Sequence, residues 1–230
     1  MQRQAIFDSS RTYRYSMSRV WDESKQKIVF IMLNPSIANE NTDDNTTKKC
    51  ITFAKSFGYG SLEIINLFAY VATDYNELRN LSKEVAIGKE NTDYIIRAVN
   101  SADKIVAAWG ENGTIHQRNK DIEYLLRGYD IDCLKVTARG YPSHPLFLSY
   151  KCELTPYRRP NKKFRQLIRT IPDENPQGRE GVNAIDGKII GDDSWMWCKV
   201  CHSEFPLDGT KVCKDCIEIL LDKYFENTSS

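Results

Sequence analysis

The stretch Lys27–Leu33, with the sequence KIVFIML, decides the fold. It is a near-continuous apolar run, and it ends abruptly at Asn34-Pro35-Ser36. Runs of this kind form strands that are buried on both faces, as in parallel sheets. Proline cannot donate to a sheet ladder, so we expect the strand to end at Asn34 and a polar loop to follow.

Three further apolar runs follow along the chain, and helical patterns separate all four. The expected strands are Lys27–Leu33, Leu62–Leu67, Lys104–Ala108 and Asp132–Val136, and the expected helical regions are Lys48–Phe57, Glu77–Ser101 and about His116–Arg127. Short strands that alternate with helices predict a parallel sheet with helices on both faces. We therefore expect a three-layer α/β/α domain with a central, mainly parallel four-stranded sheet. The ligand site of such a domain lies at the carboxyl ends of its strands.

The bulk composition places the chain among soluble globular proteins. Its 230 residues are 41% hydrophobic and 27% charged. No apolar run is long enough to cross a bilayer, and no apolar segment follows Met1–Gln4 as in a secretory signal. We expect a cytoplasmic monomer that makes no use of a membrane. The net charge of +1 provides no global attraction to nucleic acid, so any such binding depends on a local patch.

One local patch is present, in the stretch Pro156–Arg169 (PYRRPNKKFRQLIR), which has six cations and no acidic residue. Arg158, Arg159, Lys162 and Lys163 are candidates for contacts with DNA phosphates. The simpler alternative is a solvated linker. Near the N-terminus, Ile6–Trp21 interleaves arginines and tyrosines, which predicts an edge strand or hairpin.

Four of the seven cysteines form a tight pair of pairs near the end of the chain. They are Cys198, Cys201, Cys213 and Cys216. Two Cys-x-x-Cys knuckles can converge tetrahedrally on one Zn²⁺, and four thiolates leave no open position for water. The spacing therefore predicts a structural zinc ion rather than a catalytic one.

The composition also predicts the domain boundaries. Residues 1–172 form the α/β domain, the glycine-rich residues 173–194 form a linker, and residues 195–230 form a small module resembling a zinc ribbon or treble clef. Trp195 and Trp197, directly before the module, either stack on bases or pack the module against the main domain.

Polar residues stand where the predicted strands end. Asn34 and Asn66 terminate apolar runs, and a carboxamide can both donate and accept hydrogen bonds, which suits it to hold a water or read a base edge. An Asx turn or a helix cap is the alternative for each. Trp109 follows the third run, and His144 lies beyond the fourth.

These motifs, in this order, resemble the uracil-DNA glycosylase superfamily. The chain has Met32-Leu33-Asn34-Pro35, Ile65-Asn66-Leu67, Ala108-Trp109-Gly110 and His144-Pro145-Leu146-Phe147-Leu148-Ser149. The pattern from Lys27 to Ser149, with Asp43–Thr46, also closely resembles a bacterial family known only as a domain of unknown function. The first motif lacks the preceding glycine of the glycosylases, and the last lacks their middle Ser-Pro.

The resemblance implies a role for each matching residue. Asn34 would position the attacking water, His144 would donate a hydrogen bond to the departing base, and Asn66 would read the edge of the flipped base. Leu146 or Phe147 would enter the duplex where the base left. The aromatic residue that stacks on the base would be Phe53 or Phe68, with Trp109 as a further substrate-binding residue. Ser36 and Arg139, near the first and last motifs, would contact the DNA backbone.

Two acidic residues follow the first motif. Asp43 and Asp44, Asp44 above all, would act as a base or stabilise the sugar cation, and the alternative is loop solvation and capping of the helix at Lys48. The function expected from the resemblance is a DNA glycosylase that excises a modified pyrimidine and leaves an abasic site. The base is expected to be a hypermodified cytosine in phage DNA, in antiviral defence. There are two alternatives. One is a non-catalytic zinc-containing nucleic-acid-binding protein, and the other is a metal-dependent nuclease built on Asp43, Asp44 and His144.

Overall fold

The computed structural model describes residues 1–36, 38–158, 195–197 and 204–206. The chain divides into two units, residues 1–159 and 160–230, and each is described by itself. Several predicted features lie outside the described residues: Arg159, Lys162, Lys163, the expected linker 173–194 and the four cysteines expected to bind zinc.

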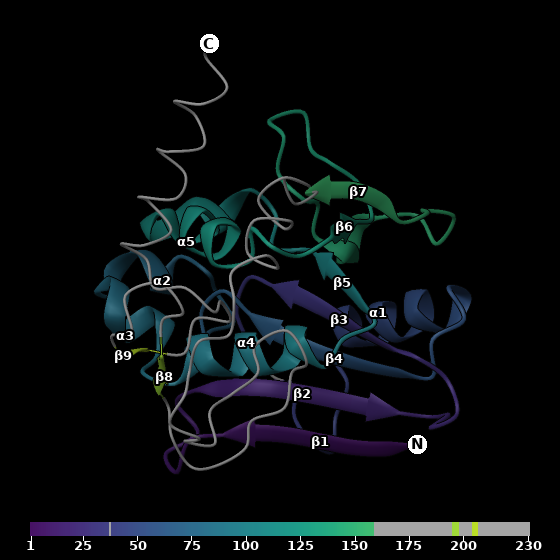
Figure 1. The fold of residues 1–230 in the computed structure, drawn as a ribbon, viewed down its shortest axis with the longest axis horizontal. Coiled ribbons are helices and arrows are strands. Elements are labelled where there is room, and N and C mark those ends of the chain that lie inside the picture. Colours follow the sequence, from purple (N-terminus) through teal and green to yellow (C-terminus); the bar gives the residue numbers. More distant parts are fainter. Residues whose placement is uncertain (37, 159–194, 198–203, 207–230) are drawn as a thin grey trace. The chain divides into compact units, whose positions relative to one another are not determined.

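A seven-stranded mixed sheet forms the centre of the first unit, in the order β1-β2-β4-β3-β5-β6-β7 (Figure 1). The strands are β1 (Gln2–Phe7), β2 (Arg14–Val20), β3 (Lys27–Met32), β4 (Ser61–Asn66), β5 (Lys104–Ala107), β6 (Ile131–Cys133) and β7 (Thr155–Arg158). The central strands β4, β3, β5 and β6 are parallel, as predicted. The expected width of four strands is wrong, because β1, β2 and β7 extend the sheet with antiparallel pairs at both edges. The edge strand or hairpin expected in Ile6–Trp21 is a hairpin of β1 and β2, which begins earlier, at Gln2.

The helices lie between the strands, and one predicted helical region is broken. The elements are α1 (Asn45–Ser56), α2 (Glu77–Asn80), α3 (Lys83–Ile87), α4 (Asn91–Asn100), the 3₁₀ helix η1 (Glu111–Gln117), α5 (Arg118–Leu125) and the 3₁₀ helix η2 (Pro145–Phe147). The region 77–101 divides into three helices because Ser82 caps α3, with its Oγ accepting from the Val85 amide at 3.3 Å, and Gly88 ends α3 at φ +84°.

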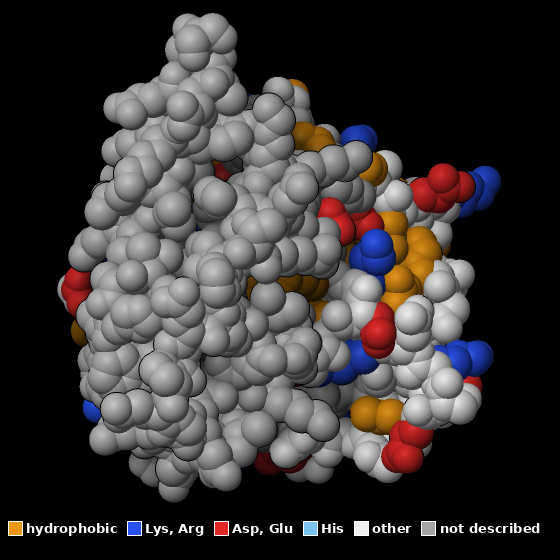
Figure 2. All heavy atoms as spheres, viewed as in Figure 1, with side chains coloured by type: hydrophobic (Ala, Val, Ile, Leu, Met, Phe, Trp, Pro, Cys, Tyr) orange, Lys and Arg blue, Asp and Glu red, His pale blue; other side chains and the backbone are white. Residues whose placement is uncertain are grey.

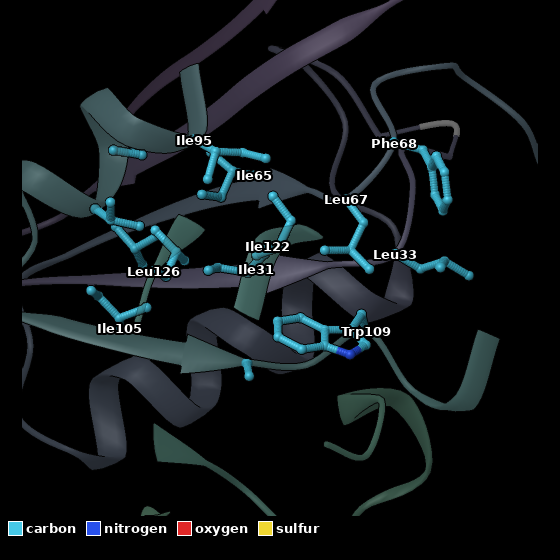
Figure 3. Close-up of a cluster of buried hydrophobic side chains, with 14 of the residues drawn as sticks. Ile31, Leu33, Ile65, Leu67, Phe68, Ile95, Ile105, Trp109, Ile122 and Leu126 are labelled. Atoms are coloured by element: carbon cyan, nitrogen blue, oxygen red, sulfur yellow. The ribbon is translucent and has the colours of Figure 1, made fainter. Parts of the chain in front are cut away.

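Alternate residues of the central strands face two separate cores. Val29, Ile31 and Leu33 pack with residues of α4 and α5, and Figure 3 shows part of this cluster. Ile28, Phe30 and Met32 pack with residues of α1. Helices therefore cover both faces, and we name the faces the α4/α5 side and the α1 side.

The strand order places a change of direction at β3. From β3 the chain passes through α1 to β4, which is one lateral neighbour of β3 in the sheet. It then crosses to β5, which is the other lateral neighbour of β3. The segments that follow β3 and β5 therefore lead to helices on opposite faces. Open α/β sheets bind their ligands outside the carboxyl ends of the strands at such a switch point.

The second unit contains a described antiparallel strand pair, β8 (Trp195–Trp197) and β9 (Glu204–Pro206). Trp195 is opposite Pro206, and Trp197 is opposite Glu204. In the sequence, Cys198 and Cys201 fall between these two strands.

Within the described residues, no helix is long and apolar enough to cross a membrane. On the visible face of the described part, acidic and basic side chains alternate (Figure 2).

Candidate active site

Asn34 follows β3 and connects the loops after two neighbouring strands. Its Nδ2 donates to the carbonyl oxygens of Ala72, at 2.7 Å, and Pro35, at 3.0 Å. Two carbonyl acceptors use both hydrogens of the amide nitrogen, so the side-chain oxygen is left as an acceptor. The half-buried amide is therefore oriented to accept a hydrogen bond, which a water molecule can donate.

Asn66 ends β4 and is the least satisfied polar side chain of the predicted set. The residue is 1% exposed, and within the described structure neither Oδ1 nor Nδ2 has a hydrogen-bond partner. Its register partner is Met32, and Leu62 and Ile64 of the same strand pack on the α1 side. Strand alternation therefore places the Asn66 side chain on the α1 side, at the carboxyl edge of the sheet.

The two neighbouring aspartates have different surroundings. The Asp43 side chain is 7% exposed, and it binds Arg19 and Arg3, each at 2.8 Å. Asp44 caps α1, with Oδ1 accepting from the Thr47 amide at 2.7 Å, and no described residue donates a hydrogen bond to its other oxygen. Asp43 is thus part of an ion-pair network, while Asp44 keeps a free oxygen.

His144 lies beside the glycine that follows β5. A Cβ atom added to Gly110 would lie 3.7 Å from the His144 Cβ, and the Gly110 amide donates to Pro142 at 2.8 Å. The ring Nδ1 accepts from the Leu146 amide at 3.3 Å, so a neutral ring carries its proton on Nε2. Burial lowers the pKa of His144 below its ordinary value of 6.5, and the charge of Asp44 partly offsets this effect. The imidazole is therefore neutral at pH 7 and can donate from Nε2.

The aromatic residues expected to stack on a base belong to the packed cores. Phe53 and Phe68 are 0% exposed, and Trp109 is 1% exposed. Phe53 lies in the α1-side core, and Phe68 and Trp109 lie with Leu33 in the α4/α5-side core (Figure 3). Gly113 is required by this packing, since a Cβ there would approach the Trp109 ring to 2.2 Å.

The segment after His144 presents large apolar side chains at the surface. Phe147 is 86% exposed and Tyr150 is 58% exposed, whereas Leu146 is half-buried. Lys49 of α1 holds this segment, because its Nζ donates to the Leu146 carbonyl at 3.0 Å and lies 4.7 Å from the centre of the Tyr150 ring.

The residues expected to contact the DNA backbone are dispersed. Ser36 is half-buried in the loop after β3, and Arg139 is exposed and pairs with Glu111 at 3.3 Å. Arg158 ends β7, where its backbone pairs with Ile131.

Two residues near the site were given no role of their own in the sequence analysis. One is Lys49, and the other is Arg14, a buried cation of β2 whose pKa is affected by Asp44. Neither belongs to a motif, so only the folded arrangement identifies them. Among the described residues, no group of three or more His, Cys, Asp or Glu side chains could hold a metal ion.

Comparison with known families adds one finding. The family described as "Protein of unknown function (DUF1643)" matches residues 14–146, which is more than half of the chain. The chain belongs to the DUF1643 family. The residues matched to DUF1643 begin at Arg14 and include Asn34, Asp44, Asn66 and His144. No curated protein and no solved structure matches the chain.

Proposed function

We propose that this DUF1643 protein is a DNA glycosylase related to the uracil-DNA glycosylases, which hydrolyses the N-glycosidic bond of a flipped, modified pyrimidine. The observation that carries the proposal is the Asn66 side chain, which is 1% exposed and has no described partner for either polar atom. A buried amide without partners is costly, so it calls for an explanation such as a ligand that completes its hydrogen bonds. A base edge offers one donor and one acceptor side by side, which matches a carboxamide.

The remaining groups at this edge of the sheet suit the bond that must break. The C1′–N bond breaks with both electrons leaving on the base, and the oxygen of a water molecule bonds to C1′. Asn34 Oδ1 accepts a hydrogen bond from that water, and the free oxygen of Asp44 takes the proton that the water loses. The base anion then takes up one proton and Asp44 gives up the proton that it accepted, so one water is consumed and a free base and an abasic sugar are formed.

Stabilising the negative charge on the departing base requires more from the protein than activating the water does. The reason is that the sugar becomes an oxocarbenium-like electrophile, which an oriented water attacks readily. The neutral His144 ring donates from Nε2, since Nδ1 already accepts from the Leu146 amide. A preorganised donor of this kind contributes about 3–4 kcal/mol to the stabilisation of the transition state.

The rim of the site suits contact with a duplex. Phe147 of the His144 motif is 86% exposed, so it is the better placed of the two candidates to fill the gap that a flipped base leaves. The basic stretch Arg158–Arg169 would bind phosphates and offset the cost of flipping.

A structural zinc ion fits the donor set of the second unit. Cys198, Cys201, Cys213 and Cys216 would provide four thiolates, the ligand set of closed structural zinc sites. The β8–β9 pair supports this proposal, because Cys198 and Cys201 fall between the paired strands in the sequence. The zinc would stabilise a small module that assists DNA binding and would take no part in the reaction.

The proposed function is tested by incubating the purified protein with unmodified DNA, uracil-containing DNA and phage DNA that carries hypermodified cytosine. Mass spectrometry detects released bases, and alkaline cleavage detects abasic sites. We expect release from a modified DNA, in keeping with a role in defence against phages, and loss of release in Asn34→Ala and His144→Ala.

Two results would contradict the proposal. DNA binding that is unchanged in His144→Ala, with no base released from any DNA, would indicate a non-catalytic nucleic-acid-binding protein. Cleavage of the DNA backbone that requires an added divalent metal would indicate a nuclease, which the pairing of Asp43 with Arg3 and Arg19 disfavours.

A further inference from the structure

An irregularity in the β1–β2 pair sets the direction of Arg14. Ile6 is opposite Ser16 and Phe7 is opposite Arg14, so Tyr15 has no partner on β1. Tyr15 stacks on Tyr94 of α4, with ring centres 4.8 Å apart. Arg14 instead reaches the Ala38 carbonyl with Nη1, at 2.5 Å, and Ala38 belongs to the α1-side core. The extra residue acts as a β-bulge, which commonly redirects side chains near functional sites.

The Arg14 guanidinium is buried with few partners. The residue is 3% exposed, and its Nε has no hydrogen-bond partner among the described residues. The bond to Ala38 is the one side-chain hydrogen bond found for Arg14 there, and no carboxylate of that part lies within ion-pair distance. Burial lowers the pKa of Arg14 to about 10, while Asp44 partly offsets the effect, so the group remains charged at neutral pH. A buried cation in this state favours an anionic partner.

Arg14 and Asn66 come from adjacent strands. Met17 of β2 is the register partner of Ile64 of β4, and further along, the Arg14 amide donates to the Ala69 carbonyl at 2.9 Å. Both side chains belong to the α1 side at the carboxyl edge. A guanidinium and an amide with unused donors therefore lie on the same side of two adjacent strands, with Arg14 opposite Ala69, three residues beyond Asn66 along the chain. The charge of Asp44 acts on both Arg14 and His144, which places these groups at the same edge.

We propose that Arg14 is a substrate-binding residue, and that its guanidinium and the Asn66 amide together bind a substrate oxygen that carries negative charge. This inference rests on the proposed function and deepens it. The oxygen belongs either to the departing base, whose carbonyl gains charge as the C1′–N bond breaks, or to a phosphate next to the flipped nucleotide. Both sources share one chemistry, because each supplies a charged acceptor for N–H donors.

The test measures binding of small ligands to the full-length protein, without need of base release. Free uracil, free cytosine and inorganic phosphate are titrated by ligand-observed NMR into the wild type, Arg14→Gln and Arg14→Lys. Arg97→Gln is the matched control, since Arg97 is an exposed arginine of α4. Thermal unfolding of each variant checks the fold.

We expect Arg14→Gln to weaken the affinity for a base or for phosphate about 10- to 100-fold, as for the loss of a charge-assisted hydrogen bond. Arg14→Lys should recover part of the loss, and Arg97→Gln should have no effect. Loss confined to the bases assigns the oxygen to the base, and loss confined to phosphate assigns it to the backbone. Absence of binding to the wild type, or equal affinities in wild type and folded Arg14→Gln, would overturn the inference.

A second variant covers the case in which Arg14→Gln does not fold. Asn66→Asp adds a negative charge on the side of the sheet that holds the buried Arg14 cation, so it should raise the melting temperature and abolish binding of the charged ligand. Unchanged ligand binding in Asn66→Asp would overturn the inference. Ligand binding that depends on Arg14, without base release from any DNA, would contradict only the glycosylase proposal. Base release that is equal in wild type and Arg14→Gln would contradict only the role of Arg14.

Discussion

Two buried arginines of β2 bind the same loop and differ in how fully they are satisfied. Arg19, at 1% exposure, binds Asp43 and also donates to the carbonyls of Gln4, Ser18 and Asn39. Arg14, at 3% exposure, donates to the Ala38 carbonyl, and its buried Nε has no partner in the described part of the chain.

The difference distinguishes an arginine that stabilises the fold, Arg19, from one that we expect to bind a ligand, Arg14. A buried charge is tolerated when ion pairs and hydrogen bonds replace the water that it loses. The Arg19–Asp43 pair meets this condition within the protein. The group of Arg14, Asn66 and Asp44 does not, so we infer that a ligand completes it. Each of the following variants tests one side of this contrast.

The largest effect is expected where the satisfied pair is broken. Asp43→Ala would leave Arg19 buried without its counter-charge, which costs about 3–5 kcal/mol in the free energy of unfolding. Urea unfolding measures this loss. Arg3→Gln is the control, because Arg3 is 34% exposed in its own pair with Asp43 and should cost far less. If both variants lost the same free energy of unfolding, the buried Arg19–Asp43 pair would contribute no more to stability than the more exposed Arg3–Asp43 pair.

His144→Asn removes the proposed catalytic donor and can keep the local structure. The asparagine oxygen can accept from the Leu146 amide in place of Nδ1, but no group replaces the donor at Nε2. We expect the activation free energy of base release to rise by about 3–4 kcal/mol, so that the rate falls roughly 100- to 1000-fold, with little change in stability. Single-turnover kinetics measures the rate, and a variant with the wild-type rate would exclude His144 from the reaction.

The sequence predicted the centre of the sheet better than its edges. The four parallel strands are apolar on both faces, so their composition identified them, as with Ile28–Met32 of β3. The outer strands have polar residues, and β7 overlaps the start of a stretch that was interpreted as a basic patch. The width of the sheet was therefore underestimated.

The sequence proposed candidate site residues only where a motif marks them. Asn34, Asn66 and His144 stand at strand ends or in motifs, so they were named as candidates. Arg14 was noted only as one of the arginines in Ile6–Trp21, because its individual surroundings depend on a bulge at Tyr15 and on its contact with the loop at Ala38, and both arise from tertiary packing. The burial of Phe53 in the core also could not be predicted, since an aromatic residue on a helix suits a core and a binding site equally well.

A smaller effect is expected at the cap of α1. Asp44→Ala removes the acceptor for the Thr47 amide and should cost about 1 kcal/mol of stability, whereas Asp44→Asn can retain the cap. If the free oxygen of Asp44 takes the proton of the attacking water, both variants lose activity. Base release by Asp44→Asn at the wild-type rate would restrict Asp44 to capping.

The pH dependence of stability provides a weaker effect with a definite sign. Burial holds the pKa of folded His144 below the ordinary value of 6.5, so above pH 6.5 the ring is neutral in both states and contributes nothing. As the pH falls below 6.5, the unfolded chain binds the proton first, and stability is lost until the folded pKa is reached. His144→Asn should therefore lose less stability between pH 7 and pH 5 than the wild type. An equal loss, measured by urea unfolding at both pH values, would contradict the lowered pKa.

The central claim is that the buried Asn66 amide serves a ligand and not the fold. It is tested most directly by Asn66→Leu, compared with Asn91→Leu. Asn91 is equally buried, but its Nδ2 donates to the carbonyls of Asn66 and Leu67, so Asn91→Leu should cost about 1–3 kcal/mol. We predict that Asn66→Leu leaves the free energy of unfolding equal to or above that of the wild type and abolishes base release. A loss of stability as large as that of Asn91→Leu, or base release at the wild-type rate, would contradict the account.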